Sequence, residues 1–438
     1  MSGRDIDEVD VLVAGAGLAG LTTAAVAAGG ASPPPEVMVV DTRSVGGRAR
    51  TDRRGDFLFN QGPRALYRGG LGRAVLGRLG LTPHGGPPPL SSSYAWHDGR
   101  VERLPDNGSR LATSSLLGVR SRARLGLLLS RLGRIDARAL GDRSTQDWID
   151  SLELRPDAQG LVTMLTRVAT YTPDLSVLSA DAGVRQLQLA LVDGVDYLDG
   201  GWQQLVDGLA DVAERRGVEV RTGARVTSLA PAPAGDRWLV GLGDGREVTA
   251  SSVVLALGSP AATAAVLGRD PGWELGADAT AACLDLGLAR VPARPVLFGL
   301  ERPLYLSTHA PAARLAPPGR SVVHAMRYGA RTAEGDAAEL WELATAAGIE
   351  QADVITDRFL RRMVVAHSLP RPGVGLDGRP AVAVAGFEGV FVAGDWVGPA
   401  GLLADASLAS AETAGQLAAR HAPRRGRHPG RDPVVPAS

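Results

Sequence analysis

The chain has 438 residues, of which 45% are hydrophobic and 21% are charged, and its 47 basic and 47 acidic residues leave no formal net charge. A chain of this length forms roughly two or three domains, and its composition excludes both a disordered chain and a strongly basic nucleic-acid-binding protein. All 47 basic residues are Arg, which excludes chemistry by a lysine amine. Cys283 is the only cysteine, which excludes an intrachain disulfide and a multi-cysteine metal site and favours a reducing, cytoplasmic location.

The first 41 residues predict a β-α-β unit. Residues 11–31 carry no charge, but their glycines and the acidic flank before them argue against a membrane span and a signal peptide. VDVLVAG predicts a buried strand, GAGLAGLTTAAVAAGG a glycine turn with an alanine-rich helix that ends at Gly29 and Gly30, and EVMVVD a second strand. This unit is one half of a doubly wound α/β sheet of the Rossmann type.

The motif GAGLAG indicates a nucleotide-binding turn. Gly15 permits a tight turn, Gly17 lets a pyrophosphate approach the backbone, and Gly20 lets the helix pack against the sheet. The helix N-terminus offers unpaired N–H groups to phosphates, and Asp41 at the end of the second strand suits the hydroxyls of an adenosine ribose. The alternative is a glycine turn that serves packing alone. The motif leaves NAD and FAD open, because both carry the same ADP moiety.

The middle of the chain changes pattern twice. Residues 111–191 predict helices, with N-terminal caps at Ser144 and Ser179. A helix over 200–217 and strands within 218–258 then restore the sheet pattern. The chain is therefore expected to re-enter its first domain.

The last third predicts a second mixed region and a return to the sheet. Residues 281–328 combine strand-like runs with prolines, and a helix is expected near 336–348. GVFVAGDW at 389–396 predicts a strand, and a long helix follows over 402–421. The tail at 424–438, rich in Pro, Gly and Arg, is expected to be disordered.

Two further stretches carry a family resemblance. TRSVGGRART at 42–51 and GVFVAGDWVGPAGLLADASLASAE at 389–412, taken in order with GAGLAG, resemble the flavin-binding pattern of the superfamily that contains flavin amine oxidases, phytoene desaturases and protoporphyrinogen oxidases. FNQGPRALY at 59–67 and YLDGGWQQLVDGL at 197–209 extend it. The resemblance implies FAD, held by a Rossmann-type (glutathione-reductase-like) α/β domain, and a discontinuous mixed α+β cap that binds substrate. The implied FAD-binding domain comprises residues 1–84, 195–260 and 380–423, and the cap comprises 85–194 and 261–379.

The resemblance also implies roles for individual residues. Arg48 would meet a phosphate, Val226 would hold the adenine through its backbone, and Asp395 would bond the ribityl or pyrophosphate region. A helix that starts near Leu402 to Ala404 would direct its positive end at the flavin N1 and C2 carbonyl. The residues expected to bind FAD are Gly15, Gly17, Leu18, Ala19, Gly20, Asp41, Thr42, Arg43, Gly46, Gly47, Arg48, Gly62, Pro63, Arg64, Val226, Gly394, Asp395, Leu402, Leu403 and Ala404.

The implied activity is that of a dehydrogenase or desaturase that takes a hydride from an apolar small molecule onto flavin N5, closest to phytoene-dehydrogenase-like proteins. A flavin amine oxidase is an alternative, although the missing lysine and the distance of Cys283 from the C-terminal motif count against it. A non-catalytic binding protein resembling the Rab GDP-dissociation inhibitors is another. Candidate catalytic residues are Arg64, Tyr67 and His324; a lone strand histidine such as His324 is more often a hydrogen-bonded core residue.

The resemblance also implies which molecules the protein binds or reacts with. The substrate is expected to be an apolar small molecule, and the electron acceptor is left open between oxygen, a quinone and others. Neither nucleic acid nor a metal ion is expected. Leucines and arginines alternate faces over residues 120–138, which favours a cap helix with a solvated arginine face; a weak contact with an anionic membrane surface is the alternative.

Overall fold

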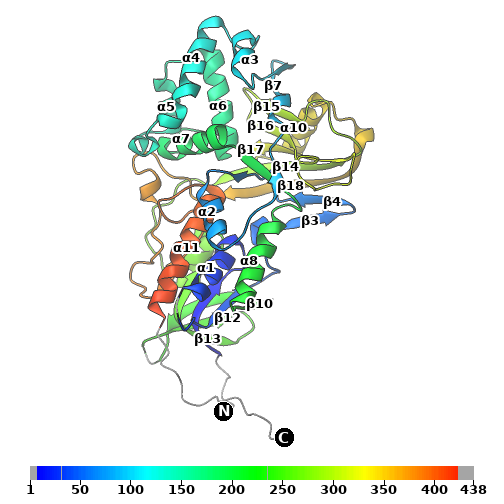
Figure 1. The fold of residues 1–438 in the computed structure, drawn as a ribbon. Helices are drawn as coiled ribbons and strands as arrows, with labels where there is room; N and C mark the ends of the chain where they lie inside the picture. The colour runs from blue at the N-terminus through cyan, green and yellow to red at the C-terminus, as the bar shows by residue number, and fades with distance from the viewer. Residues whose placement is uncertain (1–6, 31, 234, 423–438) are drawn as a thin grey trace.

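The computed structural model describes residues 7–30, 32–233 and 235–422, so the tail predicted at 424–438 lies outside the described residues. Within these ranges the chain forms two seven-stranded sheets, one in the lower and one in the upper part of Figure 1, and two small sheets. The expected α/β architecture with a mixed cap is confirmed.

The first sheet is mainly parallel. In pairing order its strands are β10 (Glu219–Thr222), β2 (Val37–Asp41), β1 (Asp7–Ala14), β13 (Glu247–Leu255), β12 (Trp238–Leu242) and β11 (Val226–Pro231), and β19 (Val390–Val392) pairs with the end of β13. The antiparallel pairs are β11 with β12 and β12 with β13, and the other pairs are parallel. The register aligns Val40, Ala14, Leu255 and Val392 in one row. The chain therefore leaves four neighbouring strands at one sheet edge, where ligands bind in open α/β sheets.

Three helices cover one face of this sheet: α1 (Leu18–Gly29), α8 (Gln203–Arg215) and α11 (Leu403–His421). Small residues let α1 and α11 pack closely, because a Cβ on Gly415 would lie 2.6 Å from the carbonyl oxygen of Thr23. The helix near the N-terminus of the chain thus lies against the last helix described (Figure 1).

The second sheet forms the core of the cap. In pairing order its strands are β18 (Val354–Ala366), β14 (Ala279–Leu288), β17 (Ser321–Tyr328), β16 (Leu304–Thr308), β15 (Val296–Gly299), β7 (Ser93–His97) and β8 (Arg100–Arg103). Alternate residues of a strand face opposite sides of a sheet. Ala281 and Cys283 accordingly pack towards the helices within residues 119–188, whereas Ala282 and Leu284 pack towards α10 (Ala333–Ala346).

The remaining elements connect the two sheets and complete the cap. The cap helices are α3 (Gly108–Thr113), α4 (Val119–Arg131), α5 (Thr145–Ser151), α6 (Pro156–Thr170), α7 (Ala180–Gln188) and α10 (Ala333–Ala346). Between the sheets (Figure 1) lie the hairpin β3 (Thr51–Arg54) and β4 (Phe57–Asn60), the three-stranded sheet β5 (Leu66–Tyr67), β9 (Val195–Leu198) and β6 (Gly85–Gly86), and the helix α2 (Leu71–Arg78). The helix α9 (Pro260–Leu267) packs against β11 of the first sheet. Short turns of helix are η1 (Gly47–Ala49), η2 (Leu90–Ser92), η3 (Leu132–Arg134), η4 (Ala137–Leu140), η5 (Leu189–Asp193), η6 (Gln351–Asp353) and η7 (Leu376–Gly378).

Most predicted elements are present, with shifted ends. The helix expected near 336–348 is α10, which begins at Ala333 and ends at Ala346, and the last helix starts at Leu403 as expected. Ser144 caps α5 in a complete capping box. Ser179 occupies the cap position of α7 but makes no cap bond, because its hydroxyl donates to the side chain of Asp181. The residue boundaries of the two domains stay a prediction.

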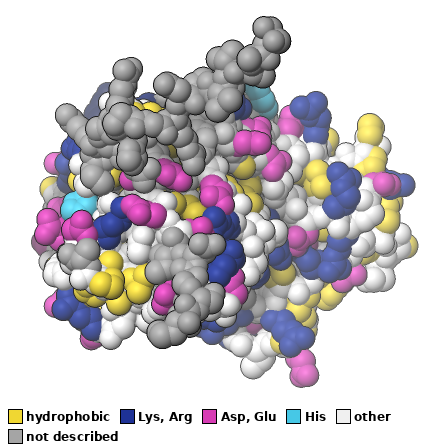
Figure 2. Space-filling view, turned by 90° about the horizontal axis from the view of Figure 1, so that it is seen from below, with side chains coloured by type: hydrophobic (Ala, Val, Ile, Leu, Met, Phe, Trp, Pro, Cys, Tyr) yellow, Lys and Arg dark blue, Asp and Glu magenta, His cyan; other side chains and the backbone are white. Residues whose placement is uncertain are grey.

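Charges of both signs are interspersed on the described part of the face in Figure 2. Among the described ion pairs, Arg221 pairs with Asp7, and Arg237 pairs with Glu8. None of the described helices is both long and apolar enough to cross a membrane. On α4, Arg120, Arg124 and Leu127 are exposed while Leu125 is buried, and the choice between a solvated face and a weak membrane contact stays a prediction.

Candidate active site

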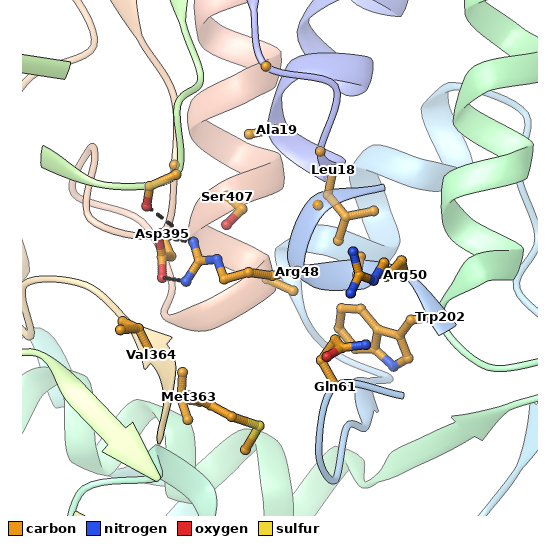
Figure 3. A pocket seen from close by; sticks show the side chains of 18 of the residues that line it. Leu18, Ala19, Arg48, Arg50, Gln61, Trp202, Met363, Val364, Asp395 and Ser407 are labelled. Carbon is orange, nitrogen blue, oxygen red and sulfur yellow. Dashed lines mark hydrogen bonds and ion pairs between the residues drawn. The ribbon is translucent and has the colours of Figure 1, made fainter. Parts of the chain in front are cut away.

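A cavity of about 1000 Å³ opens at the edge where β1, β2, β13 and β19 end. It is lined by the turns after β1, β2 and β13, by the segments on both sides of the β3–β4 hairpin, by β18 and by the start of α11. Figure 3 shows side chains from these segments facing one another across it. We call the part around α1 and β2 the α1 end, and the part around β17 and β18 the cap end.

The glycine turn at the α1 end leaves room where a phosphate would lie. Gly15 has φ +110°, and a Cβ there would lie 2.3 Å from the carbonyl oxygen of Ala256. A Cβ on Gly20 would lie 1.7 Å from the carbonyl oxygen of Gly15, so Gly20 packs the helix but does not line the cavity. A Cβ on Gly17 would meet nothing within 4 Å. Gly17 is also the N-cap of α1 and no side chain caps that end, so the helix directs free N–H groups into the open space.

The residues expected around the adenosine line the same end. Asp41 holds the turn, because its Oδ2 accepts from the Ala16 N–H at 2.6 Å and its Oδ1 from the Arg43 N–H at 2.8 Å. Its carboxylate also faces the cavity, together with Thr42 and Arg43. Val226 lines the opposite wall. Asp41 and Val226 thus line the same cavity, and their contact with the ribose and the adenine of FAD stays a prediction.

An ion pair crosses the middle of the cavity. Arg48 donates two hydrogen bonds to Asp395, from Nη1 to Oδ2 at 2.9 Å and from Nη2 to Oδ1 at 2.7 Å (Figure 3). Asp395 is buried, and its Oδ2 also accepts from the His367 N–H. Burial alone would raise the pKa of Asp395, but the Arg48 guanidinium outweighs it and holds the pKa below its usual range. Arg48, expected to meet a phosphate, is thus already paired, and Asp395 serves first to anchor it.

The two glycines before Arg48 have different roles: Gly46 supports the glycine turn, and Gly47 lines the cavity. Gly46 has φ +118°, and its N–H donates to the carbonyl oxygen of Ala16, which ties the GGR stretch to the GAGLAG turn. Gly47 and Gly394 line the cavity as expected, whereas Gly46 does not.

Helix α11 begins at the cavity wall. Leu402 is its N-cap and provides no side-chain cap, and Leu403 and Ala404 line the cavity while Leu402 does not. Leu403 has φ +55°, a left-handed conformation that costs a non-glycine residue about 1 kcal/mol or more. The strained turn presents the uncapped N–H groups of α11 to the cavity, as the resemblance implies.

Asp405, in the first turn of α11, is a cavity residue that the sequence did not single out. Its Oδ1 accepts from the Gly72 N–H at 2.8 Å, and a Cβ on Gly70 would lie 2.5 Å from its Oδ2. The carboxylate therefore faces the start of α2. Burial raises the pKa of Asp405 to about 6.

The GPR stretch lies where the two ends of the cavity meet. Pro63, Arg64 and Tyr67 line the cavity, but Gly62 packs against Met363, whose Cε would lie 2.7 Å from an added Cβ. The Arg64 guanidinium lies 5.4 Å from the ring centre of Trp202, and its buried Nε has no hydrogen-bond partner. Burial, followed by the charge of Arg48, lowers the pKa of Arg64 to about 10.

Two tyrosine hydroxyls near Arg64 are committed to the backbone. Tyr67 donates to the carbonyl oxygen of Ala169 at 3.0 Å, and Tyr171 donates to that of Pro63 at 3.0 Å. Burial raises the pKa of both hydroxyls. Tyr67 is thus suited to shape the wall, and its proposed catalytic role stays a prediction.

The cap end is mostly apolar, and sequence analysis missed its residues. Met326 of β17 and Phe359, Leu360 and Met363 of β18 line it, with Tyr171 from the end of α6. Their only signal in the sequence is hydrophobicity, which does not distinguish a pocket wall from a core. The polar Gln61 and Arg50 were missed for a different reason: they lie within the stretches FNQGPRALY and TRSVGGRART, but the resemblance assigns them no role.

His324 does not line the cavity. It is wholly buried in β17, and its Nδ1 lies 2.5 Å from Oδ1 of Asp285 on β14. Cys283 donates to the same oxygen, and ligand atoms of these three residues lie within 4.8 Å of one another. The carboxylate is also bonded by Arg358, so its charge is already balanced. The structural alternative for His324, a hydrogen-bonded core residue, agrees with this placement, and its suggested role in the pocket does not.

The donors of the cavity suit FAD. Uncapped N–H groups and the open space at Gly17 fit a pyrophosphate, Asp41 fits a ribose, and the start of α11 fits an electron-rich ring edge. A volume of about 1000 Å³ lies at the top of the range of ligand pockets, which suits a long ligand with a substrate beside it.

Solved structures share this fold. An oxidoreductase from Methanosarcina mazei is 18% identical, covers 92% of this chain and 99% of its own, and gives a TM-score of 0.71. A putrescine oxidase variant is 17% identical over 95% of this chain and 100% of its own, with a TM-score of 0.72. Cyclohexylamine oxidase from Brevibacterium oxydans is 18% identical over 94% of this chain and 98% of its own, with a TM-score of 0.68. No curated protein sequence gives a significant match.

The sequence itself matches a family. The model of the flavin-containing amine oxidoreductases matches residues 18–291, which is more than half of the chain and includes the GGR and GPR stretches. The chain therefore belongs to this family, and it is an FAD-dependent oxidoreductase.

Proposed function

We propose that the protein is a dehydrogenase or desaturase that removes a hydride from an apolar small molecule carrying no positive charge. FAD supplies the hydride acceptor when it is bound. The observation that carries this proposal is the electrostatic character of the cap end, where an unpaired arginine lies among apolar side chains.

A protonated amine would find no unpaired carboxylate that it could reach in the described wall of the cavity: the Oδ2 of Asp405 has no hydrogen-bond partner, but it is buried against Gly70. Asp395 is paired with Arg48, and Asp405 faces the backbone of Gly70 and Gly72. Asp41 lies at the α1 end. Arg64 would repel a cation, since a guanidinium whose pKa is about 10 is protonated at neutral pH. The cavity therefore favours neutral or anionic substrates over the amines that name the family.

The chain's own groups would orient substrate and exclude water. Met326, Leu360 and Met363 supply an apolar surface on which a substrate C–H bond can be held. The N-terminal N–H groups of α11 would stabilise negative charge at the cofactor, and the Arg48–Asp395 pair would hold the sheet edge and the GGR loop together. No described side chain at the cap end is a free base, so the position of the substrate carries the reaction.

The electron acceptor is part of the proposal. We propose oxygen or a quinone, because the protein would need no second redox site for either. The exposed arginines of α4 would make a weak contact with an anionic membrane, from which an apolar substrate could be taken up. Two of them, Arg120 and Arg124, have no ionic partner among the described residues. We place no nucleic acid among the partners.

The test is anaerobic bleaching of the FAD-loaded protein. Three matched panels would be used: neutral apolar molecules, apolar carboxylates, and primary and secondary amines of the same carbon skeletons. We expect loss of the oxidised flavin absorbance with members of the first two panels and none with the amines. Reoxidation by air and by a soluble quinone would then distinguish the acceptors.

Arg64→Met, with Arg361→Met on β18 as a control at another arginine that lines the cavity, links the result to the site. We expect Arg64→Met to slow bleaching by apolar carboxylates at least about tenfold, the effect of losing one charge-assisted hydrogen bond, when the rates are compared per bound FAD. Bleaching by amines alone would establish an amine oxidase. Bound flavin that is reduced by none of the three panels and not by light would establish a binding protein.

A further inference from the structure

The buried charged row of the cap sheet is not used by the proposed reaction. Asp285 on β14 is directly opposite His324 on β17 and opposite Arg358 on β18, so the three side chains lie in one row across the sheet. Asp285 and His324 are wholly buried, and Arg358 is 7% exposed. A charged row inside a sheet is costly unless every member is paired.

Arg358 extends this row out of the cap. Its Nε donates to Oδ2 of Asp285 at 2.8 Å, and its Nη1 donates to Oδ2 of Asp52 at 2.7 Å. Its Nη2 donates to the carbonyl oxygen of Asn60. Asp52 and Asn60 belong to the β3–β4 hairpin, so one guanidinium fastens the base of that hairpin to the cap sheet.

Asp52 in turn binds two side chains of the cavity wall. Its Oδ2 accepts from Nε2 of Gln61 at 2.8 Å, and its Oδ1 accepts from Nε of Arg50 at 3.1 Å. Gln61 and Arg50 both line the cavity, and Figure 3 shows them beside Trp202. They flank the hairpin on its two sides, one just before β3 and the other just after β4.

We propose that Arg358 and Asp52 are positioning residues, which hold the amide of Gln61 and the guanidinium of Arg50 against the bound FAD, with Asp285 and His324 fixing Arg358. With Nε2 committed to Asp52, the orientation of the Gln61 amide is set, and its Oε1 is left as an acceptor for a polar edge of the cofactor. Groups behind a binding residue commonly control affinity by fixing its geometry.

Asp52→Asn is the primary test, with Asp56→Asn as its matched control. Both residues lie in the same hairpin segment and lose the same charge, but Asp56 is exposed and, among the described residues, forms an ion pair only with Arg320. We expect Asp52→Asn to raise the dissociation constant for FAD about tenfold and to shift the flavin absorption bands and the midpoint potential. Asp56→Asn should change the dissociation constant less than about twofold.

A double-mutant cycle with Gln61→Leu separates positioning from general loosening. If Asp52 acts partly through Gln61, the double variant loses less FAD affinity than the sum of the two single variants. Hydrogen exchange of residues 61–65 in the FAD-free protein should be faster in Asp52→Asn and unchanged in Asp56→Asn. These readouts need no substrate, so they are independent of the proposed reaction.

Arg358→Lys should reproduce the effect of Asp52→Asn, since one ammonium group cannot replace the spread donors of a guanidinium. Should that variant fail to fold, Asp52→Asn and its control decide alone. Equal behaviour of Asp52→Asn and Asp56→Asn, or full additivity with Gln61→Leu together with unchanged exchange at residues 61–65, would overturn the proposal.

Discussion

The two ends of the cavity are built from different materials. At the α1 end the binding groups are backbone N–H groups and the space left by Gly17, held by a turn in which Gly15 and Gly20 contact backbone atoms. At the cap end they are side chains, such as Met363 and Arg64, from segments far apart in the chain. The backbone turn requires glycines at fixed positions of one short motif. The side-chain wall, in contrast, depends on tertiary contacts between segments far apart in the chain. The first end can therefore be read from a short motif, and the second cannot.

Gly17→Ala and Gly20→Ala give the largest expected effects and test the α1 end. The Cβ of Gly17→Ala has free space, so the free energy of unfolding without FAD should stay within about 0.5 kcal/mol. It would fill the space for the pyrophosphate, so FAD affinity should fall on the order of 100-fold. The Cβ of Gly20→Ala collides with a backbone oxygen, and unfolding should become easier by about 3 kcal/mol.

Urea unfolding of the FAD-free proteins and fluorescence titration with FAD measure the two effects separately. If Gly17→Ala were destabilised as much as Gly20→Ala, the turn would be a packing device and the comparison between the two ends would fail.

Arg48→Met tests the pair between the two ends. It leaves the buried Asp395 without its ionic partner, and because Arg48 is 38% exposed we expect a loss of only about 2 kcal/mol at pH 7. The folded-state pKa of Asp395 is depressed, so this contribution is present above the usual carboxyl pKa and is lost as the pH falls through the folded pKa. Urea unfolding between pH 3 and pH 7 checks both points. Arg43→Met, at the α1 end, should change stability by less than about 0.5 kcal/mol.

Asp405→Asn has the opposite pH dependence. Burial raises the folded-state pKa of Asp405 to about 6, so its ionisation costs stability as the pH rises from about 4 to 6. Relative to Asp405→Asn, the wild-type protein should therefore lose about 2 kcal/mol between pH 4 and pH 7. Urea unfolding at several pH values measures the difference. Asp211→Asn, at an exposed position of α8, is the control for the loss of one carboxylate, and a flat difference for Asp405→Asn would mean that its carboxyl is solvated.

Much of the fold was predictable because local patterns determine it. The β-α-β unit at the N-terminus, the helices between residues 111 and 191 and the start of α11 follow from hydrophobic runs, glycines and caps. The register that brings Val40, Ala14, Leu255 and Val392 into one row was not predictable, since it depends on pairing between strands distant in the chain. The order of the cap strands has the same origin.

The candidate site was predictable where a residue type has a geometric reason. Gly17 and Asp41 lie at the cavity, and Gly20 has its expected packing role. Arg48 lies there too, but its pairing with Asp395 could not be foreseen from two motifs read separately. His324 shows the reverse limit: a titratable residue on a strand near the pocket faces into a buried row, because strand register decides which side it occupies.

The closure of the cavity by α11 has a consequence for biosynthesis. The wall that begins at Gly15 is incomplete until Leu403 and Ala404 have been translated and α11 has docked on α1. Domains of a growing chain generally fold as units from the N-terminus. The nascent β-α-β unit must then stay soluble on the ribosome without help from the cofactor. FAD would bind only late in folding, so that bound FAD marks a chain whose fold is nearly complete.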